Sequence, residues 1–217
     1  MDEVAPWTWD EADTDEEFPC EQLTDTGPMA PVSGTDLAAL GVRGIQFGSW
    51  DGQAAGWLNT DAVGLRCGDV RTETGRVYHV DGATYFTKAD ARQRLPFADG
   101  ATRWVYAEHF IEHLSLKEGI RWLREVRRIL TPGGLLRLTT PDLARYVDGY
   151  RLDDGFYSTH RERLLLLGAP PHEVPERRAF MLNQIFHFHG HQWIYDEDEL
   201  IFALTTAGFP EGLCWSM

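Results

Sequence analysis

The stretch from Ala89 to Asp142 constrains the fold of this chain most, because its hydrophobic pattern predicts a strand, a helix and a second strand in succession. Residues 104–107 form a short apolar run after the turn residues Asp99 and Gly100, which is typical of a buried strand. Ser115 is a suitable N-cap for a helix over residues 116–130, which should end at Thr131-Pro132-Gly133-Gly134 before a second strand over 135–140. Apolar residues spaced by three and four define the helix face: Leu116, Ile120, Leu123, Val126 and Leu130.

Two strands joined by one helix form a right-handed parallel crossover, which is the unit of an open α/β sheet. Ligands of such sheets bind beyond the carboxyl ends of the strands. Four polar residues directly follow the two predicted strands, and we expect them to face a site: Glu108, His109, Thr140 and Asp142.

The segments around these strands resemble the class I S-adenosylmethionine (SAM)-dependent methyltransferases, and in particular a small bacterial branch of that family. The resemblance extends over about residues 43 to 209. It implies a Rossmann-like α/β sheet, methyl transfer as the activity and SAM as the cofactor. The segments that carry it are Ile45 to Trp50, Gly56 to Asp61, Leu95-Pro96-Phe97, Glu108 to Leu114, Leu130 to Gly134 and Gly190 to Asp196.

The resemblance also implies which residues contact the cofactor. Asp61, at the end of the second strand, would bind the ribose hydroxyls, because a carboxylate can accept two hydrogen bonds from neighbouring hydroxyl groups. Asp90 would contact the adenine amino group. The alternative roles are an Asx-turn for Asp61 and a strand-end cap for Asp90. The full predicted set is Gly48, Ser49, Trp50, Asp61, Asp90, Ala91 and Glu108.

The loop after the first strand departs from the family pattern. Family members resemble Gly-Cys-Gly where this chain has Gly48-Ser49-Trp50, so a tryptophan stands at a position of close backbone approach. The indole would occupy part of the cofactor's space or stack on a ligand. Two hypotheses therefore remain open: a SAM-dependent methyltransferase, and a methyltransferase-fold protein that uses a reshaped pocket for another reaction or a nucleotide-like ligand.

Methyl transfer requires the acceptor atom, the methyl group and the sulfur to lie in line, and a hydroxyl acceptor is helped by a base. His109, directly after the predicted strand, is the first candidate base and His191 the second, whereas His113 is expected to pack or cap within the fold. Two groupings could instead bind metal, namely His109 with His113, and His187, His189 and His191 if they alternate on a strand. With Glu108 and Glu112 nearby, a zinc or iron site is conceivable. The alternating set follows no recognised zinc pattern, and histidines four residues apart on a helix are often incidental, so no metal site is predicted.

Charge divides the chain at about residue 42. Residues 1–42 contain eleven acidic residues and no lysine or arginine, while the remaining 175 residues contain 20 basic and 23 acidic residues. We therefore expect an acidic N-terminal tail or lid over 1–42 and a methyltransferase-like domain over 43–217. Within that domain, residues 142–190 suit three helices that would cover the substrate, and the final helix would start near Asp196 and end at Gly208.

The nearly balanced body has no basic stripe, which argues against nucleic acid as a partner and favours a small molecule. Three cysteines without a C-x-x-C pair suggest neither a disulfide framework nor a zinc knuckle, and no signal peptide or membrane span is predicted, so a cytoplasmic protein is expected. After the last helix only Gly212 to Ser216 could add a strand, so the sheet should be abbreviated at its C-terminal edge. A second copy could complete that edge as a homodimer.

The substrate class expected from the resemblance is a small molecule of sugar, nucleoside or secondary-metabolite biosynthesis. A scaffold that uses the acidic, aromatic N-terminal segment to bind a partner is a weaker alternative, because the polar residues predicted to face the site are all present.

Overall fold

The computed structural model describes residues 17–50, 52–166, 168–171, 174–187 and 190–210. The chain divides into two compact units. The first takes in the residues up to Ala107 together with Arg128–Arg137, and the second takes in Glu108–Arg127 and the residues from Leu138 onward.

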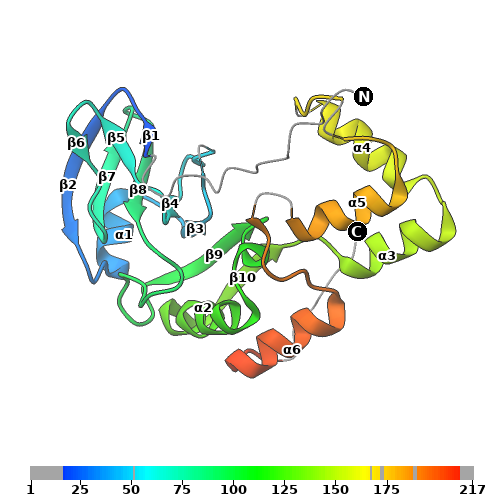
Figure 1. The fold of residues 1–217 in the computed structure, drawn as a ribbon. Coiled ribbons are helices and arrows are strands. Elements are labelled where there is room, and N and C mark those ends of the chain that lie inside the picture. Colours follow the sequence, from blue (N-terminus) through cyan, green and yellow to red (C-terminus); the bar gives the residue numbers. More distant parts are fainter. Residues whose placement is uncertain (1–16, 51, 167, 172–173, 188–189, 211–217) are drawn as a thin grey trace. The chain divides into compact units, whose positions relative to one another are not determined.

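A seven-stranded sheet is the main feature of the first unit, with strand order β10-β9-β3-β4-β8-β7-β2 (Figure 1). β3 pairs in parallel with β4 and with β9, and β4 pairs in parallel with β8, so the predicted open α/β sheet is confirmed. The strands are β2 (Leu23–Met29), β3 (Ile45–Phe47), β4 (Leu58–Asp61), β7 (Arg76–Val80), β8 (Thr84–Lys88), β9 (Thr102–Glu108) and β10 (Leu130–Thr139).

The described residues of the connection between β3 and β4 form no helix, and side chains form a row beside these strands instead. The ring of Trp57 lies 6.0 Å from that of Tyr106. Arg43 lies over the Trp57 ring at 5.8 Å and Arg137 over the Tyr106 ring at 5.5 Å, which are cation–π distances. Gly44 fits beside this row because a Cβ there would lie 2.4 Å from the carbonyl oxygen of Trp104.

Strands β7 and β8 pair antiparallel and form a hairpin. Residues 81–83 connect the two strands, and Ala83 N–H donates to the Val80 carbonyl at 3.0 Å. Asp81 and Gly82 are the central residues of this turn, with left-handed φ of 51° and 67°. The Asp81 carboxylate accepts the backbone N–H groups of Glu21 and Gln22, at 2.8 and 2.6 Å. The turn is thereby tied to the N-terminal segment.

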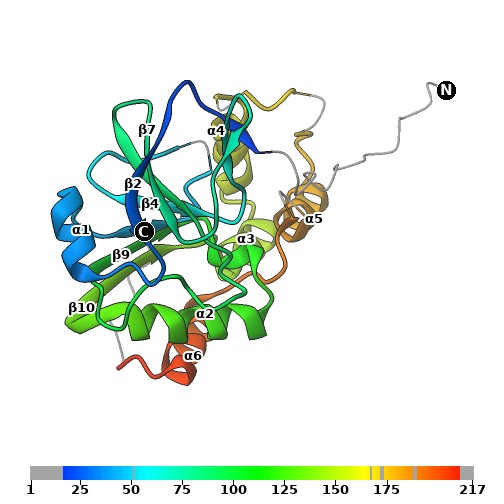
Figure 2. The same ribbon diagram turned by 90° about the vertical axis from the view of Figure 1, so that its left-hand side faces the viewer.

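That N-terminal segment supplies the edge of the main sheet. β2 pairs antiparallel with β7 (Figure 2). In this pairing Leu23 lies opposite Val80. The predicted boundary at residue 42 therefore does not separate a tail from the first unit over residues 17–42, while residues 1–16 lie outside the described residues. The same segment forms helix α1 (Gly34–Leu40), and a small sheet joins β1 (Phe18–Pro19), β5 (Leu65–Cys67) and β6 (Val70–Arg71).

Helix α2 (Leu116–Ile129) confirms the predicted amphipathic helix, and a short 3-10 turn, η1 (Ile111–His113), precedes it. Ser115 and Glu118 form a capping box: Ser115 N–H donates to the Glu118 carboxylate at 3.0 Å, and the Ser115 hydroxyl accepts the Glu118 N–H at 3.4 Å. The buried face is rotated from the predicted one, because Leu116 and Ile120 are only half-buried. Its members are Gly119, Trp122, Leu123, Val126 and Ile129.

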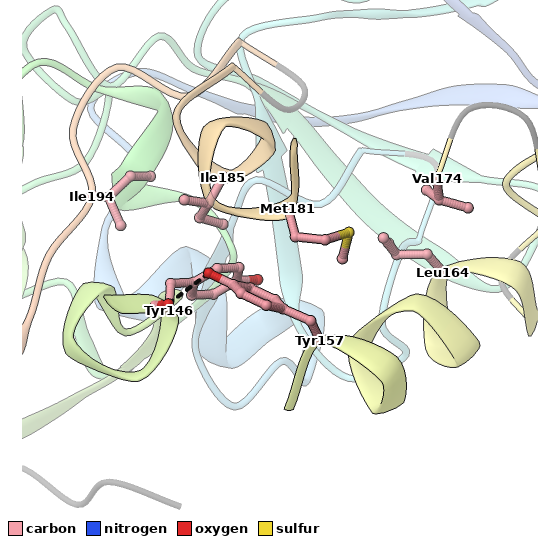
Figure 3. Packing of buried hydrophobic residues seen from close by; sticks show 7 residues of the cluster. All are labelled: Tyr146, Tyr157, Leu164, Val174, Met181, Ile185 and Ile194. Atoms are coloured by element: carbon pink, nitrogen blue, oxygen red, sulfur yellow. Dashed lines mark hydrogen bonds between the residues drawn. The ribbon is translucent and has the colours of Figure 1, made fainter. Parts of the chain in front are cut away.

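The second unit is mainly helical, and the three helices predicted between residues 142 and 190 are confirmed. Seven residues from these helices and from the loops around them form one buried cluster (Figure 3): Tyr146, Tyr157, Leu164, Val174, Met181, Ile185 and Ile194. The Tyr157 hydroxyl donates to the Tyr146 carbonyl at 2.6 Å, so the polar end of one buried ring is satisfied. The helices are α3 (Leu143–Leu152), α4 (Phe156–Leu166), α5 (Arg178–His187) and α6 (Glu197–Ala207).

Helix α6 begins and ends as predicted, with Asp196 as N-cap and Gly208 in the left-handed C-cap conformation. Among the described residues, β10 is the outermost strand on its side of the sheet. The extra strand considered for residues 212–216 lies outside the described residues. None of the helices within the described ranges is long and apolar enough to cross a membrane.

Candidate functional site

Three neighbouring parallel strands of the first unit bring most of the predicted cofactor residues to one edge. β3 ends at Phe47, β4 at Asp61 and β8 at Lys88. Because β3 pairs with β4 and β4 with β8 in parallel, their carboxyl ends lie side by side. The structure thus gathers Gly48, Ser49, Trp50, Asp61, Asp90 and Ala91 at or just beyond this edge.

The loop after β3 is a tight turn built on left-handed residues. Gly48 has φ 63° and Trp50 has φ 45°, a value that costs a residue with a side chain about 1–2 kcal/mol. Ser49 N–H donates to the Thr60 carbonyl at 3.1 Å, and Gly52 N–H donates to the Ser49 carbonyl at 2.8 Å. The hydroxyl of Ser49 has no hydrogen-bond partner among the described residues, although the residue is only 3% exposed.

Asp61 holds this loop through its carboxylate. Oδ2 accepts the backbone N–H of Trp50 at 3.0 Å, and Oδ1 accepts the N–H of Val63 at 3.0 Å. The bond to Val63 is the Asx-turn that was the alternative role for this residue. The bond to Trp50 is an additional contact between the ends of two strands, so the turn role does not exclude the binding role.

The indole of Trp50 packs on the N-terminal segment. Its ring lies 5.0 Å from that of Phe18 in a tilted arrangement, and the residue remains 52% exposed. The contact with Phe18 gives the indole a partner of its own within the first unit.

Asp90 lies two residues beyond β8 and is engaged by Arg92. Its carboxylate accepts Arg92 N–H at 2.9 Å, Nε at 3.0 Å and Nη2 at 3.1 Å. Burial raises the pKa of the Asp90 carboxyl, but the hydrogen bonds and charge of Arg92 outweigh it and the pKa falls below its usual value. Asp90 is thus an ionised group that already has a strong partner, and Ala91 beside it is buried.

The polar groups at this edge fit a cofactor that contains adenosine. A carboxylate such as that of Asp61 can accept several hydrogen bonds, as ribose hydroxyls would require. The loop places glycine at its first position, and the unsatisfied Ser49 hydroxyl is a buried polar atom that a ligand would satisfy.

The remaining predicted residues belong to the second unit. Glu108 ends β9 and is exposed, and His109 follows it with φ 48°. His109 N–H donates to the Thr139 carbonyl at 3.0 Å, and its Nδ1 lies 3.2 Å from Oε1 of Glu112. This hydrogen bond, with the charges of Glu112 and Glu108, raises the pKa of His109 above its ordinary value, although burial opposes the shift.

Glu112 lies beside both candidate catalytic histidines, and the sequence indicates it only as a residue near the possible metal grouping. The residue is 0% exposed, and its Oε2 has no hydrogen-bond partner among the described residues. A carboxylate oxygen of Glu112 and one ring nitrogen each of His113 and His191 lie within 4.8 Å of one another. The repeated pair Glu108-His109 and Glu112-His113 was the available sequence signal, but nothing in the sequence brings His191 to it.

Other expected roles change in the structure. Asp142 serves as the N-cap of α3, where its carboxylate accepts Ala144 N–H at 2.9 Å. The Thr140 hydroxyl is buried without a partner among the described residues. The idea that His187, His189 and His191 alternate on one strand is wrong, because His187 is the last residue of helix α5, and His189 lies outside the described residues.

Comparison with known proteins gives one family. Residues 46–138 match the methyltransferase domain family. No curated protein matches the chain. A solved structure described as PigF with SAH is similar at 14% sequence identity and a TM-score of 0.34, over 57% of this chain and 29% of that one. This chain therefore spans less than a third of that protein.

The matched region begins within β3 and ends within β10, so it contains the whole parallel part of the sheet and the loops at its carboxyl edge. Over this region the chain is similar to the methyltransferase domain family, whose members use SAM as their cofactor.

Proposed function

We propose that this protein transfers the methyl group of SAM to a small molecule with a hydroxyl acceptor, of the sugar, nucleoside or secondary-metabolite class. The contact between Trp50 N–H and the Asp61 carboxylate carries the proposal, because it fixes a carboxylate at the carboxyl ends of two adjacent parallel strands. The substrate class is supported by the charge of residues 43–217, where 20 basic and 23 acidic residues leave no excess of positive charge for a polyanion.

The cofactor residues have distinct tasks in this proposal. Asp61 accepts hydrogen bonds from the ribose hydroxyls, the loop Gly48-Ser49-Trp50 offers backbone N–H groups and the Ser49 hydroxyl, and Asp90 with Ala91 contacts the adenine. Glu108 is assigned to the same cofactor. When bound, SAM supplies an electrophilic methyl group whose bond to sulfur breaks as the acceptor oxygen bonds to it.

His109 is proposed as the base that accepts the proton of the acceptor hydroxyl. Its ring is oriented by Oε1 of Glu112 at 3.2 Å, an arrangement in which a carboxylate fixes the imidazole. His191 was the second candidate for this role. Its ring nitrogen Nδ1 lies 2.7 Å from the Ile185 carbonyl, which suits a fixed ligand better than a mobile base.

Calorimetric titration with SAM and with S-adenosylhomocysteine tests the cofactor assignment. We expect one site per chain and a loss of binding in Asp61→Ala. Asp69→Ala is the matched control, because Asp69 is an exposed aspartate in the turn after β5. Equal binding by Asp61→Ala and the wild-type protein would contradict the assignment of Asp61.

Transfer of a labelled methyl group to panels of sugars, nucleosides and phenols then tests the substrate class, with His109→Gln as the variant that should lose activity while keeping SAM affinity. The alternative function, a fold that binds a nucleotide-like ligand without methylating, depends on Trp50. If neither SAM nor S-adenosylhomocysteine binds the wild-type protein but both bind Trp50→Gly, the indole closes the site and that alternative holds.

A further inference from the structure

The cluster around Glu112 has a feature that a packed core does not need. Glu112 is completely buried, one carboxylate oxygen binds His109, and the other has no hydrogen-bond partner among the described residues. A buried carboxylate oxygen without a partner costs about 1–3 kcal/mol or more. Such an atom in a native structure calls for a group that would satisfy it.

Two histidines lie beside this carboxylate. The rings of His113 and His191 meet edge to face, with centroids 4.9 Å apart. One ring nitrogen from each and a carboxylate oxygen of Glu112 lie within 4.8 Å of one another. Ligands of a tetrahedral zinc ion lie about 3.4 Å apart at metal–ligand distances of about 2.1 Å, so these side chains need only a small approach to share an ion.

The surroundings fix the ring of His191. His191 Nδ1 lies 2.7 Å from the Ile185 carbonyl, and a carbonyl can only accept, so Nδ1 carries the proton and, in the neutral ring, the lone pair is on Nε2. A metal-binding histidine usually donates its second N–H to a carbonyl in this way. Ile185 itself belongs to the buried cluster of the second unit (Figure 3), so the acceptor is held by rigid packing.

The loop that carries His191 is tied to Glu112 through the backbone. Gln192 and Trp193 N–H groups both donate to the Glu112 carbonyl, at 2.7 and 3.2 Å. Glu112 and His113 are adjacent in the turn η1. The two segments that supply the three groups are therefore joined independently of the side chains.

We propose that Glu112, His113 and His191 form a binding site for a divalent transition-metal cation. Two imidazole nitrogens and one carboxylate oxygen suit zinc, iron, cobalt or manganese more than calcium or magnesium, which prefer oxygen ligands only. Three protein ligands leave a coordination position open for water or for the hydroxyl oxygen of a ligand, as catalytic zinc sites do. His109 is not one of the three ligands, and its Nδ1 lies 3.2 Å from Oε1 of Glu112.

The test uses the full chain purified without a histidine tag and stripped of metal with a chelator. Titration with Zn²⁺ and Mn²⁺ by calorimetry gives stoichiometry and affinity, and Co²⁺ gives a visible absorption spectrum that reports the ligand geometry. We expect one ion per chain. His113→Ala, His191→Ala and Glu112→Gln should each lower the affinity by more than about 100-fold, since even partners of the ligands contribute 10- to 100-fold.

His187→Ala is the matched control, because His187 is exposed at the end of α5, four residues before His191. It should bind metal as the wild-type protein does. Urea unfolding of every variant identifies those that fail to fold. If Glu112→Gln does not fold, the metal affinities of His113→Ala and His191→Ala decide the test. A wild-type chain that takes up none of the three ions, or a folded His113→Ala/His191→Ala protein that binds as well as the wild-type chain, would overturn the proposal.

Discussion

Two loops of this protein, one in each compact unit, contain a left-handed residue that a carboxylate holds by a hydrogen bond. Trp50 after β3 and His109 after β9 both have a left-handed conformation, with φ of 45° and 48°. Asp61 holds Trp50 by its backbone N–H, whereas Glu112 holds His109 by its side chain. The first arrangement is insensitive to which side chain occupies the loop, and the second depends on the imidazole.

This difference explains how a tryptophan can stand where related proteins have glycine. The bond that closes the loop uses only the backbone, and the indole packs on Phe18. If a hydrophobic residue replaced His109, Oε1 of the fully buried Glu112 would lose its partner. The free energy of unfolding of variants in metal-free buffer tests this contrast between the backbone contact at Trp50 and the side-chain contact at His109.

The largest effect is expected for His109→Ala. The substitution leaves a buried carboxylate oxygen unsatisfied, so the free energy of unfolding should fall by about 2–3 kcal/mol. Urea denaturation measures it. His109→Gln keeps a donor and should recover part of the loss, whereas equal losses in both variants would show that the Glu112 contact does not stabilise the loop.

A smaller loss, about 1–2 kcal/mol, is expected for Asp61→Asn. The amide keeps one oxygen for Trp50 or Val63 N–H but turns an NH₂ group toward the other. The same denaturation experiment applies, with Asp69→Asn as the control at an exposed turn. A loss no larger than that of the control would mean that the carboxylate does not hold the loop.

Glycine and alanine compared at the same position isolate the backbone strain. At residue 50 and at residue 109 the glycine variant should be about 1 kcal/mol more stable than the alanine variant, because both lack the side chain and only alanine resists a left-handed φ. The comparison predicts the same gap in both loops. Two clearly different gaps would show that one loop relaxes when its side chain is removed.

The smallest effect is the coupling between Phe18 and Trp50. A double-mutant cycle with Phe18→Ala and Trp50→Ala should give an interaction energy of about 0.5–1 kcal/mol, as aromatic pairs usually do. Thermal or urea unfolding of the four proteins provides it. A coupling of zero would mean that the half-exposed indole gains nothing from the N-terminal segment.

Much of the fold was predictable because hydrophobic periodicity and turn residues act locally. Strand β9 and helices α2 to α6 lie close to their predicted ranges. β2 was missed because its sequence, LTDTGPM, is mostly polar and contains glycine and proline, which are depleted in strands. Its strand conformation comes from pairing with β7 and not from its own pattern.

The candidate site was predictable only where the order of strands in a parallel sheet determines which residues are neighbours. Asp61 and Asp90 could be placed because strand ends in a parallel sheet share an edge. The role of Glu112 could not, since its partner His191 is supplied by a loop 79 residues later and is held there by backbone hydrogen bonds to the Glu112 carbonyl. Contacts between distant segments depend on packing that no local pattern records.

The pairing of β2 with β7 also affects the order in which the chain can fold during synthesis. β2 ends at Met29 and its partner ends at Val80, so β2 leaves the ribosome 51 residues ahead of the strand it needs. At about 5–20 residues per second, it waits about 3–10 seconds without a partner. A polar strand interrupted by glycine and proline is suited to that delay, because an unpaired apolar strand would be prone to aggregate.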